Sequence, residues 1–142
     1  MRRTAHRLRV LEAAVALTLS SAMLKALPFR LVARLAGSAA EALPAGTRTA
    51  APAARAIGHA VEATARRLPW KPVCLPQALA ANLMLRRRGQ LSRLCLGVRR
   101  DGATLAAHAW LLAGADGGGG VVCGGRAAAG FVPIATLRPD SP

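Results

Sequence analysis

Apolar residues in the first part of the chain recur at spacings of three and four residues, which is the period of an α-helix. The stripe runs over residues 8–23 and consists of Leu8, Leu11, Val15, Leu19 and Met23. It predicts an amphipathic or mostly buried helix, and Pro28 should interrupt that helix because proline has no amide hydrogen to donate. A second short helix is expected over residues 29–35. Residues 37–52 are rich in Gly, Ala, Ser, Thr and Pro and should form an irregular connector.

Two further helices are predicted after this connector. Helical spacing returns in residues 54–68, and Pro69 ends it because a proline restricts the preceding residue to extended geometry. The next helix should begin at Cys74 or Leu75 and run to Arg88, where a glycine follows as a stop signal. A proline-containing connection therefore separates these two helices.

The pattern changes to a period of two in residues 92–100, which predicts a half-buried β-strand. The Asp-Gly pair at residues 101–102 is a hairpin signal, so residues 104–113 should form the returning strand. Residues 121–125 are expected to form a short third strand, and residues 131–137 a closing segment. Helices come first and an antiparallel meander second, so the predicted fold class is α+β.

Length and composition favour a globular domain. The chain has 142 residues, of which 53% are hydrophobic, and one domain is the usual expectation at this length. We expect residues 1–65 to form a helical N-terminal part and residues 66–142 to form the core. The uncharged run over residues 13–24 is too short for a membrane span, which needs about 18–20 residues. Membrane association is therefore not expected, although a membrane-surface role for the first helix stays open.

The net charge of +14 favours acidic partners, such as nucleic acid, an anionic membrane surface or an acidic peptide. The chain has no Tyr, two Phe and two Trp, so a platform for stacking nucleic-acid bases is not expected. The arginines occur in short runs along the whole chain, which a coding bias toward arginine would also produce. Charge alone therefore does not identify a ligand, and nucleic acid is not an expected partner.

Cysteine chemistry singles out one residue. The three cysteines are odd in number and lack metal-ligand spacing, so we expect no disulfide framework, no metal site and a reducing compartment such as the cytoplasm. Cys74 stands at a predicted helix start, where backbone amides and the helix dipole favour the thiolate. His108 follows on a predicted strand and is the only histidine after Cys74, so the two can form the nucleophile–base pair of cysteine proteases. The alternative is that Cys74 is a buried packing residue, as Cys95 and Cys123 are expected to be.

A family resemblance is carried by several features together. A Cys-Leu pair at residue 74 opens an apolar helix that ends in LRRRG, a strand ends in GV at Val98, a HAW triplet follows at His108, and GFVPIATL closes the chain. This combination resembles the lasso peptide biosynthesis B proteins, which are leader peptidases of the transglutaminase-like superfamily. The resemblance implies a transglutaminase- or papain-like cysteine protease core.

The resemblance also implies an activity and its residues. Members hydrolyse one peptide bond of a ribosomally made precursor without ATP or a cofactor. Cys74 would attack the scissile carbonyl, and His108 would take the thiol proton and pass it to the leaving amine. Backbone amides at the start of the Cys74 helix would stabilise the oxyanion. Gln77 could assist there, or it could be a polar surface residue.

The third catalytic residue departs from the family pattern. The family carries an aspartate on the strand after the histidine, whereas residues 123–125, which should lie opposite His108, contain no acidic side chain. Asp116 is the candidate, but it belongs to the expected turn and should lie roughly 20 Å or more from His108 along an extended strand. Three alternatives stay open: a Cys-His dyad, an orienting backbone carbonyl, or a weakened enzyme.

The resemblance implies three partners. They are the precursor peptide, a separate leader-recognition protein, and an asparagine-synthetase-like cyclase that closes the ring. A separate recognition protein is expected because the chain contains no acidic, strand-rich N-terminal segment that would bind the leader. A non-catalytic transglutaminase-like adaptor is the alternative function, and it is favoured by the missing aspartate.

Overall fold

The computed structural model describes residues 1–40, 50–114 and 118–138. Four helices precede the main strands, and a fifth, one-turn helix lies between the last two strands. They are α1 (Arg2–Ala26), α2 (Phe29–Ala36), α3 (Pro52–Arg67), α4 (Cys74–Arg87) and α5 (Gly125–Ala128). Proline stands at the first position of α3, where its missing amide hydrogen is not needed. Gly89 has a positive φ of 69° just after α4, which is the backbone conformation that commonly ends a helix.

The strands form one antiparallel five-stranded sheet in the order β1-β5-β2-β3-β4. They are β1 (Ser38–Ala40), β2 (Ser92–Asp101), β3 (Thr104–Ala113), β4 (Val121–Cys123) and β5 (Val132–Arg138). The expected hairpin at residues 101–102 joins β2 to β3, and Gly102 has the positive φ that such a turn requires. The α+β class is confirmed.

The sheet is not the simple meander that the strand pattern predicted. The last strand, β5, pairs with β2 on the side away from β3, and it does not continue beyond β4. The reason is α5, which follows directly after β4 and packs against β3, so the chain crosses the sheet before it pairs again. The third strand is also shorter than expected, because α5 begins at Gly125.

The connector expected over residues 37–52 contains a strand that the composition did not indicate. Residues 38–40 form β1, which pairs with β5 at the edge of the sheet. Residues 41–49 lie outside the described part of the chain. Tertiary pairing therefore overrides a Gly- and Ala-rich composition here, since β5 offers an open edge.

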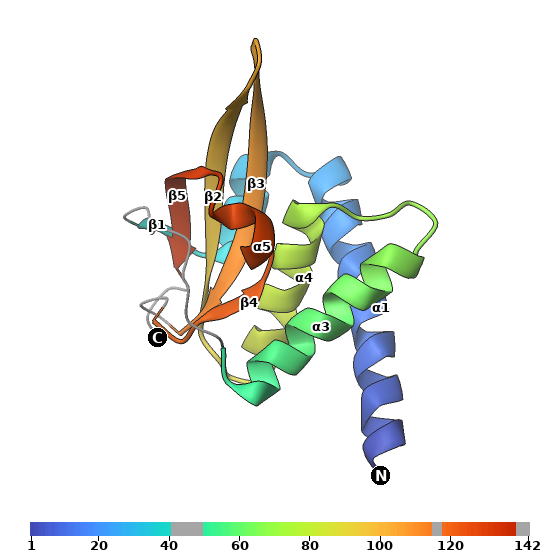
Figure 1. The fold of residues 1–142 in the computed structure, drawn as a ribbon. Coiled ribbons are helices and arrows are strands. Elements are labelled where there is room, and N and C mark those ends of the chain that lie inside the picture. Colours follow the sequence, from blue (N-terminus) through green and yellow to red (C-terminus); the bar gives the residue numbers. More distant parts are fainter. Residues whose placement is uncertain (41–49, 115–117, 139–142) are drawn as a thin grey trace.

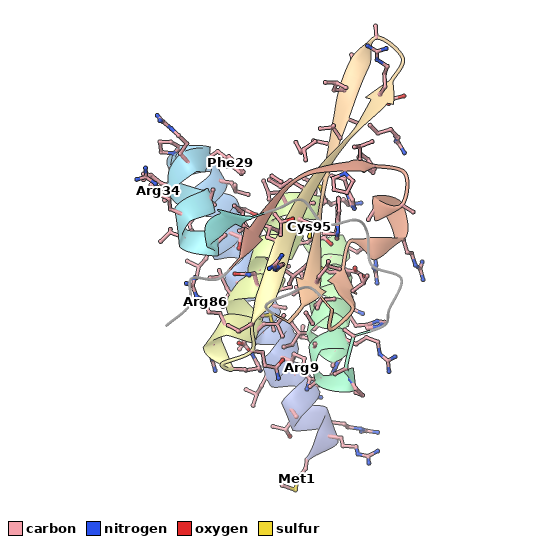
Figure 2. The ribbon with its side chains drawn as sticks, turned by 90° about the vertical axis from the view of Figure 1, so that its left-hand side faces the viewer. Met1, Arg9, Phe29, Arg34, Arg86 and Cys95 are labelled. Carbon is pink, nitrogen blue, oxygen red and sulfur yellow. The ribbon has the colours of Figure 1, made fainter. Side chains whose placement is uncertain are left out.

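The layers place the helices mainly on one face of the sheet. Figure 1 shows α1, α3 and α4 on one side of the strands, with α5 against β3. The large core lies between this helical layer and the sheet, whereas a second, smaller cluster lies on the other face of the sheet and is built from Cys95, Trp110, Leu112 and Ala128. In Figure 2, Cys95 lies within the body of the sheet, whereas Arg34 projects from α2 into solvent.

Four of the five residues of the apolar stripe of α1 face solvent, and only Met23 packs against the core, so a mostly buried helix is wrong as a description of this stripe. Leu8, Leu11, Val15 and Leu19 are each more than half exposed, with relative exposures of 62%, 66%, 56% and 53%. The buried face of α1 instead carries Ala13, Ala16, Leu17 and Ser20. Because these side chains are mostly small, the helix axes can approach closely. The described part of the chain contains no helix that is both long and apolar enough to span a membrane.

Strand β2 is covered on both faces over its first half, so the prediction of a half-buried strand was wrong there. Leu94 packs into the large core, and Cys95 packs into the smaller cluster, with exposures of 1% and 0%. Helices cover one face, and Trp110 with its neighbours covers the other. Only the far end of β2, at Arg99–Asp101, is exposed on both sides.

A bidentate ion pair joins the first and fourth helices. Arg88 donates from two guanidinium nitrogens to the two carboxylate oxygens of Glu12, at 2.8 and 2.6 Å. The hydrogen bond from Arg88 holds the pKa of the Glu12 carboxyl below its ordinary value. The pair ties the middle of α1 to the end of α4, so it helps to hold α1 in place although most of its stripe of large side chains is exposed.

Truncating two leucines of α1 tests which face of this helix stabilises the fold. Leu17→Ala should lower the free energy of unfolding by about 2–5 kcal/mol, because it empties a fully buried site. Leu11→Ala, the matched change on the exposed face, should stay within about 0.5 kcal/mol of the parent. Urea unfolding followed by circular dichroism measures both values. Equal losses would mean that the stripe is buried in solution.

Candidate active site

Cys74 is the first residue of α4, as the sequence pattern predicted. A residue of α4 holds the connection between α3 and Cys74: the side-chain amide of Gln77 donates to the Pro72 carbonyl at 2.8 Å. Lys71, in the same connection, adopts a positive φ of 41° and donates its backbone N–H to Leu68. Gln77 therefore holds the segment that leads into Cys74, a role that the sequence did not indicate.

The first turn of α4 leaves few backbone N–H groups free to bind an oxyanion. Pro76 has no amide hydrogen, and the N–H of Gln77 donates to the Val73 carbonyl at 3.2 Å. The amides of Cys74 and Leu75 are thus the first-turn donors that a developing oxyanion could use. Cys74 is the first of the 14 residues of this helix, so the positive end of the helix dipole lies at its half-buried thiol.

His108 lies on β3 at the point where this strand enters the body of the protein. Residues 109–112 are buried, whereas Thr104, Leu105 and Ala107 are exposed. The Nε2 atom of His108 is 2.7 Å from the carbonyl oxygen of Gly124. A carbonyl only accepts hydrogen bonds, so this contact requires the proton to be on Nε2. In the neutral ring, Nδ1 is then the atom that can accept a thiol proton.

Aromatic side chains fix the plane of the imidazole. The ring of His108 stacks on Trp110, with centroids 6.1 Å apart, and packs against Phe131 at 5.1 Å. The guanidinium of Arg99 covers the Phe131 ring at 4.7 Å. Gly97, the partner of His108 across the strand pair, leaves the space that Trp110 fills, since a Cβ there would lie 2.8 Å from the indole.

Gly124 can hold His108 only because it is glycine. Its φ is +75°, which L side chains rarely adopt, and a Cβ would meet the carbonyl oxygen of Ala109 at 2.6 Å. Its own N–H donates to the carboxylate of Glu62 on α3 at 3.2 Å. One residue between β4 and α5 therefore contacts both the imidazole of β3 and a side chain of the helical layer.

Cys74 and His108 approach the same segment from different elements. The helix α4 packs against both β3 and β4. The pKa of the Cys123 thiol is raised first by burial, then by the nearby charges of Glu62 and Cys74, and the next residue along the chain is the one that binds His108. Within the described part of the chain, no hydrogen bond joins the Cys74 thiol to the imidazole. The two residues reach this segment from opposite faces of the sheet, because Cys74 packs against the large core whereas the imidazole of His108 packs against Trp110 and Phe131 of the smaller cluster.

The comparison with known families identifies the domain. The family model described as Transglutaminase-like superfamily matches residues 5–136, which include Cys74, His108 and Gly124. The chain belongs to the transglutaminase-like superfamily. That superfamily includes cysteine peptidases. A search of curated proteins and a search of solved structures gave no significant match.

Asp116, the sequence candidate for the third residue of this transglutaminase-like site, lies outside the described residues, so its role stays a prediction. On either side of residues 115–117, the Ala113 N–H donates to the Gly120 carbonyl at 2.8 Å. Ala113 is five residues along β3 from His108, roughly 16 Å at about 3.3 Å per residue. The Gly124 carbonyl binds Nε2 of His108, and an orienting carbonyl was one of the alternatives left open by the sequence.

Sequence reasoning missed Glu62 and its neighbour Gly58. These two residues are four apart and lie on the same face of α3. A Cβ on Gly58 would lie only 1.9 Å from the Val122 carbonyl oxygen, so the backbone of this helix touches β4 directly. The spacing of a glycine and a glutamate was visible in the sequence, but nothing in it indicated that β4 would be their partner.

The cysteines should differ sharply in reactivity. Burial raises the pKa of the Cys95 thiol to about 11, and burial also raises the pKa of Cys123. Iodoacetamide at neutral pH should therefore label Cys74 well before Cys95 and Cys123 in the folded protein, because alkylation requires an accessible thiolate. Peptide mapping by mass spectrometry measures the three rates, and unfolding in guanidinium chloride serves as the control that exposes every thiol. Equal labelling of all three in the folded state would contradict this site.

The close approach at Gly124 can be separated from the strain of its backbone conformation. Gly102→Ala places a side chain at φ +63° in open space and should cost about 1 kcal/mol in stability. Gly124→Ala adds the contact with the Ala109 carbonyl and should cost roughly 1–3 kcal/mol more. Urea unfolding of both variants gives the difference. Equal losses of unfolding free energy in the two variants would show that the backbone around Gly124 shifts to accommodate the added methyl group without a further loss of stability.

Proposed function

We propose that this transglutaminase-like domain is a cysteine peptidase that removes the leader peptide from a ribosomally made lasso peptide precursor. The observation that carries the proposal is the hydrogen bond between His108 Nε2 and the Gly124 carbonyl. It selects the tautomer in which Nδ1 is free to act as the base, and Cys74 supplies the thiol at the start of α4. The resemblance of the HAW triplet and of the Cys-Leu helix start to the lasso B proteins supports the finer assignment.

The residues act in two stages. Cys74 Sγ adds to the scissile carbonyl carbon while its proton moves to Nδ1 of His108, and the amides of Cys74 and Leu75 stabilise the oxyanion. The C–N bond then breaks, the proton of His108 goes to the leaving amine, and a thioester forms on Cys74. A water molecule gives its proton to His108 and its oxygen adds to the thioester carbon; the C–S bond then breaks, the acid product leaves, and His108 returns the proton to Cys74 Sγ.

The partners are proposed with the activity. A separate recognition protein would deliver the leader, and an asparagine-synthetase-like cyclase would use the new amino terminus, all in the cytoplasm. The exposed end of β3 beside His108 is open to an extended peptide, and the +14 net charge would attract an acidic one. The proposal requires the thiol and the imidazole, which pack against opposite faces of the sheet in the free protein, to come into contact when the delivered substrate binds.

A non-catalytic adaptor is the second candidate. It is favoured by the missing hydrogen bond between Cys74 and His108 and by the absence of an acidic residue at 123–125. Such a protein would hold the precursor or the cyclase without cleaving. Activity measurements on single variants distinguish the two functions.

Three substitutions test the peptidase. With precursor and recognition protein present, Cys74→Ala and His108→Ala should each abolish release of the leader, because nucleophile and base act as a unit. Asp116→Asn should stay within about a few-fold of the parent, since the Gly124 carbonyl already orients the ring. Mass spectrometry of the precursor over time measures all three rates. Binding of the precursor without any cleavage by the parent protein would establish the adaptor, and a loss of about 10³-fold in Asp116→Asn would assign that residue the orienting role.

A further inference from the structure

Glu62 is a carboxylate that the proposed chemistry does not use, although it lies close to the site. It projects from α3 to the junction between β4 and α5, and its Oε1 accepts the Gly124 N–H at 3.2 Å. The side chain is half-buried, and its charge is one of the causes that raise the pKa of the Cys123 thiol. Its negative charge therefore lies within the protein beside the segment that binds His108.

The backbone of α3 sets the position of this carboxylate. Gly58 lies one turn before Glu62 on the same helix face, and its missing side chain lets the helix touch the Val122 carbonyl. The Val122 carbonyl and the Gly124 N–H both face α3, the first at Gly58 and the second at Glu62. The contact at Gly58 thus fixes the distance at which the Glu62 side chain meets the Gly124 amide.

Gly124 transmits this contact to the imidazole. Its N–H is bound by Glu62, and its carbonyl binds Nε2 of His108 at 2.7 Å. A glycine at positive φ, with no side chain of its own, depends on such contacts to keep one orientation. If the amide is released, the carbonyl is free to rotate away, and the proton on Nε2 loses the acceptor that selects this tautomer.

We propose that Glu62 is the positioning residue of the catalytic histidine: it fixes Gly124, whose carbonyl then holds His108 with its proton on Nε2. Glu62 does not touch the imidazole and acts only through the glycine. It takes from the helical layer the function that a strand aspartate has in the related peptidases. The inference rests on the proposed function for its kinetic part, but the tautomer of His108 is a property of the protein without substrate.

The first measurement needs no activity. In protein with ¹⁵N-labelled histidine, the ring nitrogen shifts of His108 report the tautomer, and His108→Gln assigns the signals among the three histidines. The parent should show the Nε2–H form. Glu62→Ala should shift His108 toward a mixture of tautomers, and Glu62→Gln, which keeps an oxygen acceptor at the same reach, should retain the parent signals. Glu62→Asp keeps the negative charge but shortens the side chain by one methylene, so its His108 signals should resemble those of Glu62→Ala. The Asp variant is used instead if the Ala variant does not fold.

The second measurement uses leader release. Glu62→Ala should lower kcat by about ten-fold or more and leave KM within about two-fold, because Glu62 orients the base and does not bind substrate. Loss of outer-shell partners of metal-bound histidines has a similar effect, about 10- to 100-fold. Glu12→Ala is the matched control: it removes a glutamate that binds Arg88 far from His108, and kcat should not change.

The outcomes separate the two proposals. An unchanged His108 tautomer and unchanged kcat in Glu62→Ala would overturn the positioning role while leaving the peptidase intact. Equal kcat losses in Glu62→Ala and Glu12→Ala would also overturn it, since they would show a general loss of stability. A protein that cleaves nothing but loses the Nε2–H form in Glu62→Ala would refute the peptidase and uphold the contact from Glu62 through Gly124 to His108.

Discussion

The backbone of Gly124 is held from two sides, and the geometry of the candidate site depends on this. Its N–H is bound by a carboxylate of the helical layer, and its carbonyl binds an imidazole of the sheet. A hydrogen bond to a charged group such as Glu62 contributes about 1.5–3 kcal/mol, and one between neutral groups, as from His108, about 0.5–1.5 kcal/mol, so the two contacts together favour one backbone orientation. Because the residue has no side chain, it can lie against the Ala109 carbonyl, where any other residue would collide. Helix α3, the sheet and α5 are thereby joined at one point.

An orienting carbonyl has different consequences from an orienting carboxylate. Both select the tautomer with the proton on Nε2, but a carboxylate also places a full negative charge beside the imidazolium that forms during catalysis. A carbonyl offers only a dipole, so more of the stabilisation of a thiolate–imidazolium pair has to come from the α4 amides. In the proposed peptidase, a delivered substrate would also have to bring together two groups that pack against opposite faces of the sheet.

Alanine content explains why the first helix turned its larger residues outward. The large core is built to a great extent from alanines of α1, α3 and α4, whose small side chains allow the helices to pack closely. In such a layer, the stripe with the most small residues is the one that fits inside. Leu8, Leu11, Val15 and Leu19 have the correct helical period, but they are too large for the space that Ala13 and Ala16 occupy. Their exposure leaves an apolar surface beside the arginines of α1 and α4.

The sequence by itself determined most local structure and the two residues that carry the proposed chemistry. Proline and glycine positions predicted the start of α4 at Cys74, and the period of two together with the Asp-Gly pair predicted the β2–β3 hairpin that carries His108. These features depend on neighbours in the chain, so a local pattern is enough to reveal them. The prediction of no acidic partner at 123–125 also followed from the sequence, and it left the backbone carbonyl as one alternative.

Only the tertiary structure decided which groups meet. The pairing of β5 with β2, the burial of the alanine face of α1, and the contacts of Glu62 and His108 with Gly124 join residues that are distant in the chain. Glu62 precedes Gly124 by 62 residues, and no periodic pattern in the sequence indicates a contact over such a separation. The meeting of the Glu62 carboxylate with Gly124 rests on how closely α3 approaches β4. That distance is set by the absence of a side chain at Gly58, which matters only once the two backbones are in contact.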